Sequence, residues 1–307
     1  MPMNSVFNAD EFGLFCRCLP DKSLHLKNEK CIGGKHSKVR LAGMAAVNAK
    51  GERLSMFVIG ESKSSRYFKG VKNIPCCYRA QPKRWMSAEL FKEWVKEIDL
   101  KFSFQKRKIA LIVDNCSAHP NMHKIDCVEL IFLPPNTTSI TQPMDQGVIR
   151  SLKAKYRSLA VKKQTATLIK ENKMLKFSIL TAMFMLTKAW NSIPDQAFIN
   201  CFKKLGTSLE AVEKHVNDDN DLFCGLDVDK TVMENLRDDL ELLKTKFDAD
   251  FYLTVEELVD IDFDVCIANK SSDEDIIAEV SEHDAIETEE ESDDECVGVS
   301  DNATKPI

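Results

Sequence analysis

The sequence lacks a long run of apolar residues. A membrane-spanning helix needs roughly 20 of them in succession, and no stretch of the 307 residues approaches that length. The start, MPMNSVFNADEFG, does not have the pattern of a signal peptide. The 11 cysteines are scattered and odd in number, which favours reduced thiols over a disulfide framework. There is no internal repeat, and we expect an intracellular protein without a membrane partner.

The C-terminal part of the chain is almost without basic residues. Residues 247–307 contain 21 acidic residues and two lysines, whereas residues 1–246 contain 40 Lys and Arg against 27 acids. A basic body favours binding to a polyanion, and an acidic tail of this kind predicts a disordered arm. An uneven but merely solvated surface is the alternative interpretation.

Hydrophobic patterning predicts strands first and helices later. Residues 108–114 contain an apolar run typical of a strand buried on both faces, and residues 40–60 read as a hairpin with its turn at 48–51. Ser87 is the expected N-cap of a helix over 86–102. The remaining expected elements are strands at 4–10, 23–27 and 127–134, a helix from Asp145, two helical stretches within 177–205 joined near Pro194, a helix at 227–247 and a short one at 254–261. This order predicts a mixed α/β domain with helices covering a sheet.

Three aspartates occupy similar places in this scheme. Asp10 is expected at the end of the first strand, Asp114 at the end of the buried strand, and Asp145 at the start of a helix. Adjacent strands and a neighbouring helix can bring three such carboxylates to one edge of a sheet. Clustered carboxylates repel each other unless cations neutralise them, and oxygen ligands suit Mg²⁺ or Mn²⁺. Two such ions can promote phosphodiester cleavage.

Each aspartate taken singly has a simpler explanation. Asp10 can be a turn residue, Asp114 can close its strand in an Asx-turn, and Asp145 can be an acid near the positive end of a helix. Together with the basic body, the three favour a metal site.

Several longer strings resemble one known family. They are FNADEFGLF, RLAGMAAVNAKGERLSMFVIGESKSSRYFKG, LIVDNCSAH and FLPPNTTSITQPMDQGVIRSLKAKYR. They are similar to the transposase domain of the Tigger and pogo group, which are DDE superfamily endonucleases related to centromere- and Jerky-type proteins. The resemblance runs from about residue 5 to about residue 165 and continues more weakly to about 205. The 30 residues between Asp114 and Asp145 fit the spacing of that group.

The resemblance implies a ribonuclease H-like fold, with a mixed sheet flanked by helices. It also implies that Asp10 bridges two metal ions while Asp114 and Asp145 complete one each, that DNA is the partner, and that the protein is nuclear. We therefore expect an endonuclease core at 1–165, followed by a helical extension at 166–246. The composition adds the expectation of an acidic, mostly disordered tail at 247–307 that contacts a nuclear protein.

The sequence also departs from the family pattern. Phe12 stands where a threonine is usual, Cys16 where an aromatic is usual, and Glu61 replaces a lysine. Family members carry an N-terminal helix-turn-helix region, whereas this chain begins nine residues before Asp10. The expectation is a truncated copy, a partial gene model or a host-adopted remnant.

Other side chains are secondary candidates. Asn115 and His119 follow Asp114 and are expected to be accessory residues, although His119 can equally be a solvent-facing turn residue. Zinc binding by cysteines and histidines between 16 and 36 fits no standard finger spacing. The segment after Gln146 has no acid before Lys170, and six of its basic residues are candidate DNA-backbone contacts: Arg150, Lys153, Lys155, Arg157, Lys162 and Lys163.

Two functions remain open from the sequence. The first is a transposase-type endonuclease that uses Mg²⁺ or Mn²⁺ for strand cleavage and transfer. The second is a domesticated, catalytically idle nuclear protein that binds DNA or acts as a scaffold. The three intact acids favour the first function, whereas the missing DNA-binding region and the acidic arm favour the second.

Overall fold

The computed structural model describes most of the N-terminal 267 residues. The described residues are 2–17, 39–63, 68–134, 142–171, 175, 177–211, 226–247, 254–262 and 267. The expected strand at 23–27, the zinc candidates from Cys18 to His36 and the acidic tail beyond 267 lie outside them. The six cysteines for which the structure gives a state are free thiols, in agreement with the sequence: Cys16, Cys76, Cys77, Cys116, Cys127 and Cys201. Among the described helices, none has the length and apolar character needed to cross a membrane.

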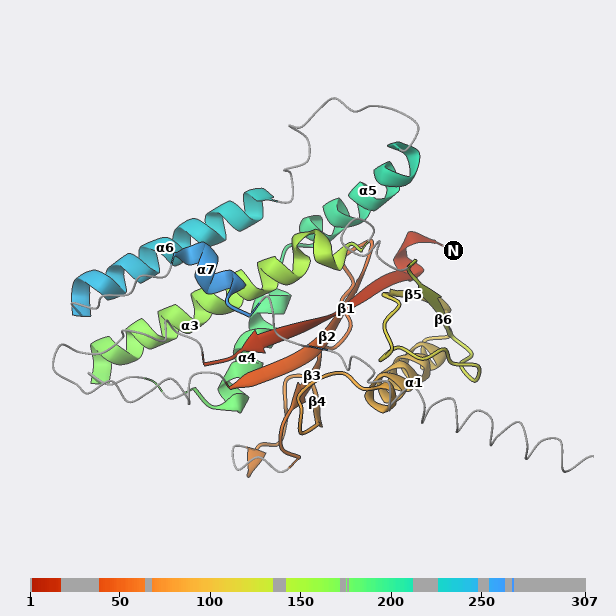
Figure 1. Cartoon of the computed structure of the whole chain (residues 1–307), viewed down its shortest axis with the longest axis horizontal. Helices are drawn as coiled ribbons and strands as arrows, with labels where there is room; N and C mark the ends of the chain where they lie inside the picture. The colour runs from red at the N-terminus through yellow and green to blue at the C-terminus, as the bar shows by residue number, and fades with distance from the viewer. Residues whose placement is uncertain are drawn as a thin grey trace, which may run out of the picture. The chain divides into compact units, whose positions relative to one another are not determined.

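A mixed sheet of six strands lies at the centre of this part of the chain (Figure 1). Its strands are β1 (Val6–Phe15), β2 (Arg40–Asn48), β3 (Phe57–Gly60), β4 (Cys77–Ala80), β5 (Ile109–Val113) and β6 (Val128–Phe132). Their order across the sheet is β4-β3-β2-β1-β5-β6. The β1–β2 and β2–β3 pairs are antiparallel, and the β3–β4, β1–β5 and β5–β6 pairs are parallel.

The strands agree with the sequence in most places and differ in two. The hairpin at 40–60 is confirmed as β2 and β3, with Gly51 at a φ of 89° in its connection, a conformation that glycine adopts without strain. The first strand runs to Phe15, so Asp10 lies in its middle and the prediction that Asp10 ends the strand is wrong. Strand β4 was not predicted, because four half-buried residues carry no clear alternation.

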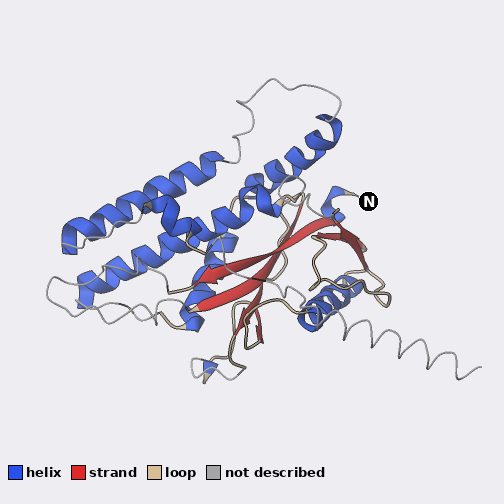
Figure 2. Cartoon of the chain, in the orientation of Figure 1, coloured by secondary structure: helices blue, strands red, loops and turns tan. Residues whose placement is uncertain are grey.

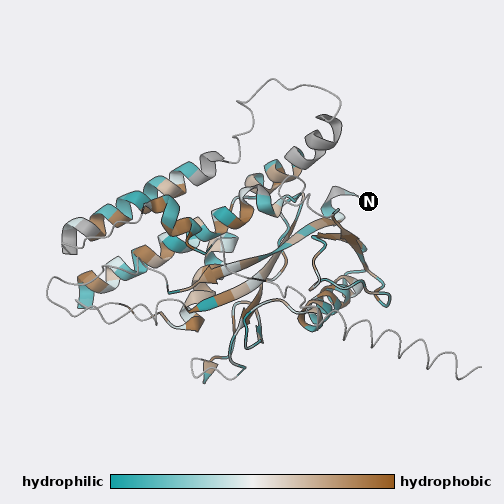
Figure 3. Ribbon diagram, in the orientation of Figure 1, coloured by the Kyte–Doolittle hydropathy of each residue, from teal (hydrophilic) through white to brown (hydrophobic). Residues whose placement is uncertain are grey.

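The helices follow the sequence closely. They are α1 (Ala88–Phe104), α3 (Ile149–Glu171), α4 (Ile179–Asn191), α5 (Asp195–Ala211), α6 (Leu226–Phe247) and α7 (Val255–Asp260). Ser87 caps α1 as predicted, because its side chain accepts a hydrogen bond from the backbone N–H of Leu90. A π-helical turn, Met144–Val148, precedes α3, so Asp145 opens a turn that leads into the helix. Figure 3 shows hydrophobic and hydrophilic residues alternating along α3 and α6. Helix α3 is buried on more than one side, because most of its residues from Ser151 to Val161 are buried.

The sheet has a separate apolar core on each face. One core joins β1 side chains such as Phe12 and Leu14 to the helical layer, and the other joins Phe7 and Ala9 to α1. This division follows from the alternation of side chains along a strand. Helices α3 and α4 therefore cover one face while α1 covers the other (Figure 2). The predicted mixed α/β class, with helices flanking a mixed sheet, is confirmed.

The segment after α7 returns to the sheet. Asp262 is buried and accepts a hydrogen bond from the backbone N–H of Phe15 at the end of β1 (3.1 Å). Its carboxylate also pairs with Lys153 Nζ and Arg157 Nη2 of α3, each at 2.7 Å. A few residues further on, the carbonyl of Ile267 accepts a hydrogen bond from Met86 N (2.8 Å). The C-terminal part described here therefore joins α3 to the first strand.

Candidate metal and nucleic-acid site

Two of the three aspartates meet because of the register of parallel strands. Asn8 of β1 lies opposite Ile112 of β5. Because the two strands are parallel, the residues two positions later, Asp10 and Asp114, are also level with each other. The neighbouring strands thus present both carboxylates at the same height in the sheet.

Asn8 brings the third aspartate to the same place. Its side chain donates to the carbonyl of Ile112 (3.1 Å) and accepts from the backbone N–H of Met144 (3.0 Å), so it joins β1, β5 and the π-helical turn. Asn8 is fully buried, where an amide without partners would cost several kcal/mol. Since Met144 precedes Asp145, this contact fixes the third carboxylate beside β1. Sequence reasoning missed Asn8, although its spacing of two residues from Asp10 places both on one face of the strand.

The electrostatics show that the three carboxylates interact. Asp10 is 9% exposed. Burial, together with the charges of Asp145, Glu11 and Asp114 and a hydrogen bond that the Asp10 carboxyl group donates to Asp145, holds the pKa of Asp10 well above its usual range. Asp145 is an exposed residue, yet its carboxyl group is hydrogen-bonded to that of Asp10, and desolvation and the charge of Asp114 raise its pKa. The cluster therefore carries a repulsion that a cation would relieve.

His119 is buried and connects Asp114 to a fourth acid. Its Nε2 lies 2.6 Å from Oε1 of Glu11, and its Nδ1 is hydrogen-bonded to the backbone carbonyl oxygen of Asp114 (3.1 Å) and lies 2.7 Å from Oδ1 of the same residue. Carboxylate and carbonyl oxygens only accept, so both ring nitrogens donate and the ring is an imidazolium. Burial alone would lower the pKa of His119, but the charge of Glu11 and hydrogen bonds to Asp114, Cys116 and Glu11 raise it. The alternative of a solvent-facing His119 is wrong.

Glu11 itself was not identified from the sequence. It is 5% exposed and points to the α1 face, opposite to its neighbour Asp10. There, the ring of His119 packs on the ring of Phe91, with centroids 4.3 Å apart. The only local signal is the Asp-Glu pair, because the partner of Glu11 lies 108 residues away. Asn115, the other accessory candidate, is exposed.

Glu11, Cys116 and His119 form a second group of metal-ligating types. One atom from each lies within 4.8 Å of the others. Burial raises the pKa of the Cys116 thiol, which leaves it less suited to ligate as a thiolate. Both nitrogens of His119 already have acceptors, the carboxylate of Glu11 for Nε2 and the backbone carbonyl of Asp114 for Nδ1. This group is better described as a hydrogen-bonded support for Asp114.

The six basic residues predicted to contact DNA do not form one exposed face. Lys153 and Arg157 are buried in their ion pairs with Asp262, so they are not available to phosphates. Arg150 pairs with Asp260 at 3.4 Å on the surface. Lys155 is half-buried, whereas Lys162 and Lys163 are exposed. The sequence could not separate these environments, since Asp262 lies more than 100 residues from both of its partners.

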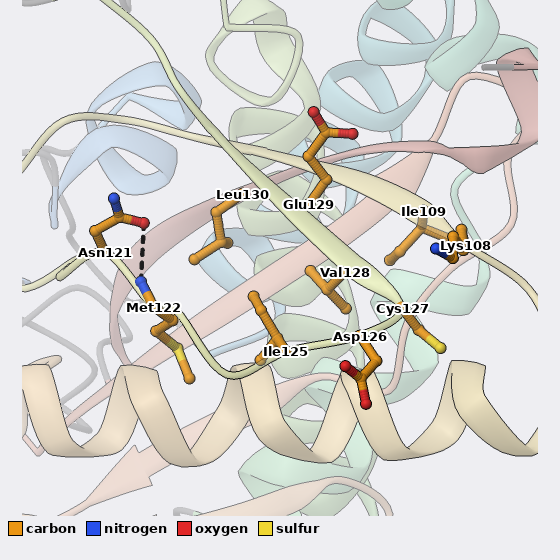
Figure 4. Close-up of a pocket in the computed structure, with 10 residues that line it drawn as sticks. All are labelled: Lys108, Ile109, Asn121, Met122, Ile125, Asp126, Cys127, Val128, Glu129 and Leu130. Carbon is orange, nitrogen blue, oxygen red and sulfur yellow. Dashed lines mark hydrogen bonds between the residues drawn. The ribbon is translucent and has the colours of Figure 1, made fainter.

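A pocket at the edge of the sheet is separate from the acid cluster (Figure 4). It lies between β6 and the loop 121–127, and α1 runs beneath it. Its volume is about 380 Å³, and its ten lining residues include Asp126 and Glu129 but none of the three clustered aspartates. Oδ1 of Asp99 on α1 accepts hydrogen bonds from the backbone N–H groups of residues 126, 127 and 128 (2.7–3.1 Å), which fixes this loop. The pocket has no part in the site described above.

Comparisons with known proteins agree with the resemblance noted in the sequence. Residues 39–202, more than half of the chain, match the family described as DDE superfamily endonuclease. The chain is 36% identical to the mouse Tigger transposable element-derived protein 4 over 203 residues, which are 66% of this chain and 39% of that protein. It is 31% identical to the human Jerky protein homolog over 220 residues, 68% of this chain and 38% of that protein.

A third relative is similar along nearly the whole chain. The ARS-binding protein 1 of Schizosaccharomyces pombe is 26% identical over 330 residues, 99% of this chain and 58% of that protein. The chain spans about two fifths of the length of the mouse and human relatives. No solved structure matches.

Proposed function

Because the chain belongs to the DDE superfamily of endonucleases, we propose that it is a transposase-derived, DNA-binding protein that cleaves phosphodiester bonds with divalent metal ions. The observation that carries this proposal is the proximity of Asp10, Asp114 and Asp145: burial, with their mutual repulsion added to it, raises the pKa of Asp10 and Asp145. The ribonuclease H-like architecture implied by the resemblance is supported by the mixed sheet with helices on both faces.

The residues fit Mg²⁺ or Mn²⁺. The cluster offers carboxylate oxygens, the donors that these hard cations prefer. When bound, a pair of such ions supplies activation of the attacking oxygen and stabilisation of the leaving oxygen. Asp10, Asp114 and Asp145 would hold the ions.

The surrounding residues have distinct tasks in this proposal. Asn8 holds the turn that carries Asp145 against β1. His119, anchored by Glu11, holds the backbone carbonyl of Asp114 and places a positive charge 2.7 Å from Oδ1 of its carboxylate. Asn115 is exposed beside Asp114, where it can contact the DNA backbone. A DNA substrate implies a nuclear location, and the name of the ARS-binding relative supports DNA as the partner.

The proposal is tested by incubating the purified chain with supercoiled plasmid and Mn²⁺. We expect nicking that a chelator abolishes. Loss of a residue that only supports a metal ligand typically lowers metal affinity or activity roughly 10–100-fold. Asp114→Ala removes a proposed ligand itself, so it should reduce the nicking rate by at least about 100-fold. Asp126→Ala, which removes an exposed carboxylate outside the cluster, is the matched control and should nick at the wild-type rate.

Retention of plasmid at low salt is measured in the same samples. Retention without nicking would contradict the endonuclease and favour the catalytically idle DNA-binding protein. If the wild-type chain neither nicked nor retained the plasmid, both the endonuclease and the idle DNA-binding protein would be contradicted.

A further inference from the structure

A pocket lined by lysines lies between α3 and α4, away from the three aspartates. Its volume is about 570 Å³. Its lining consists of three lysines, one aromatic ring and three smaller or aliphatic side chains, with no carboxylate: Leu159, Lys162, Lys163, Thr181, Phe184, Met185 and Lys188. A concave surface with this composition favours an anionic ligand.

The charges of this pocket are largely uncompensated. Lys163 and Lys188 are exposed, and neither makes an ion pair with any residue that the structure describes. Lys162 has a partner, Asp239 of α6, but their closest atoms are 3.6 Å apart and the lysine side chain is 53% exposed. At least two cations therefore face solvent from neighbouring helices, which gives the pocket a net positive charge.

Phe184 gives the pocket an aromatic surface as well. It is 50% exposed, although it belongs to a helix whose other large apolar side chains are mostly buried. Lysines beside an exposed aromatic ring are the combination by which proteins hold single-stranded nucleic acid, since phosphates contact the cations and a base stacks on the ring. An acidic peptide would satisfy the lysines without requiring an exposed ring.

Helix α3 connects this pocket rigidly to the acid cluster. It begins at Ile149, just after the turn that carries Asp145, and Lys162 lies 13 residues further along. At 1.5 Å per residue, the pocket lies about 20 Å from the start of the helix. One strand of DNA has a phosphate about every 3.4 Å along its axis, so this span corresponds to about six nucleotides.

We propose that the pocket formed by Lys162, Lys163, Lys188 and Phe184 binds the DNA strand about six nucleotides from the phosphate that is cleaved, with an unpaired base on Phe184. This inference rests on the proposed function, because the acid cluster defines where the cleaved phosphate lies. It assigns α3 a second role as a spacer between the cleavage site and a strand-binding site. Helix α4 supplies Lys188 and the aromatic ring.

The test compares binding of the full chain to a labelled single-stranded 20-mer at several salt concentrations. Each phosphate contact contributes about 0.7 to the slope of log affinity against log salt for single strands. The double variant Lys163→Ala/Lys188→Ala should therefore reduce the slope by about 1.4. The matched control is Lys92→Ala/Lys96→Ala, which removes two exposed lysines from α1 on the other face of the sheet and should leave the slope unchanged.

Phe184 is tested separately. Phe184→Ala should weaken single-strand binding about 5- to 150-fold, the range found for loss of a stacked base, while Phe184→Trp should restore it. The proposal would be overturned if the pocket and control variants had equal salt slopes, or if Phe184→Ala bound the single strand as tightly as the wild type. The proposed endonuclease would still be tested separately by Mn²⁺-dependent nicking. Unchanged DNA binding combined with carbodiimide cross-links between Lys188 and acids of 270–307 would show that the acidic segment occupies the pocket instead.

Discussion

Asp10→Asn should make the metal-free protein more stable, although the side chain it changes is 9% exposed. The neutral amide keeps the shape of the carboxylate but removes its repulsion by Asp145, Glu11 and Asp114. Functional sites commonly hold such unfavourable arrangements, and relieving them stabilises proteins by about 0.5–2 kcal/mol. A difference of this size raises the melting temperature by about 2–4 °C per kcal/mol, which thermal unfolding in a chelator would detect.

The stability that Asp10→Asn gains over the wild type should increase with pH. The pKa of Asp10 is raised on folding, so the wild-type carboxyl group destabilises the fold once pH exceeds its ordinary value of 3.8. Below that value it is protonated in both states, and the two proteins should differ little. The advantage of Asp10→Asn should therefore grow as pH rises from about 4 towards the raised pKa of Asp10. A variant that is instead destabilised at neutral pH would identify Asp10 as a structural acid.

Asp262→Ala should have the opposite effect and a larger one. Asp262 is 1% exposed, and its carboxylate neutralises two buried cations, Lys153 and Arg157, while also accepting from the backbone of Phe15. Removing one partner of a buried ion pair leaves uncompensated charge and typically costs about 3–5 kcal/mol. We expect that loss in the free energy of unfolding measured with urea.

The control for this substitution lies two residues away. Asp260 pairs with Arg150 at 3.4 Å, and both side chains are at least 40% exposed. Exposed pairs contribute about 0–1 kcal/mol, so Asp260→Ala should cost no more than that. Equal losses for the two variants would show that the ion pairs of Asp262 do not hold α3 against β1.

The contrast between Asp10 and Asp262 also explains what sequence reasoning could and could not find. Both are aspartates in the printed sequence, and only the surrounding charge distinguishes them. Asp10 could be selected because a local string resembles a known family. Asp262 could not, because its partners lie more than 100 residues earlier in the chain. For the same reason, Lys153 and Arg157 were interpreted as DNA contacts although they are buried.

The fold was more accessible than the details of the site. Periodicity located the hairpin, α1, β5 and the helices after Asp145, because each has a buried side that repeats at its own spacing. It placed the end of β1 too early, since Asp10 and Glu11 interrupt the apolar pattern although both are buried in the strand. The polar residues that break the pattern are those that build the candidate site.

The most direct test of the metal site is calorimetric titration of the purified, metal-free chain with Mn²⁺, alongside Asp10→Asn. If the three aspartates form a cation site, the wild type should bind Mn²⁺ with a saturable heat signal that Asp10→Asn lacks while remaining folded. Equal titration curves for the two proteins, or no heat from either, would contradict the assignment of Asp10, Asp114 and Asp145 as metal ligands.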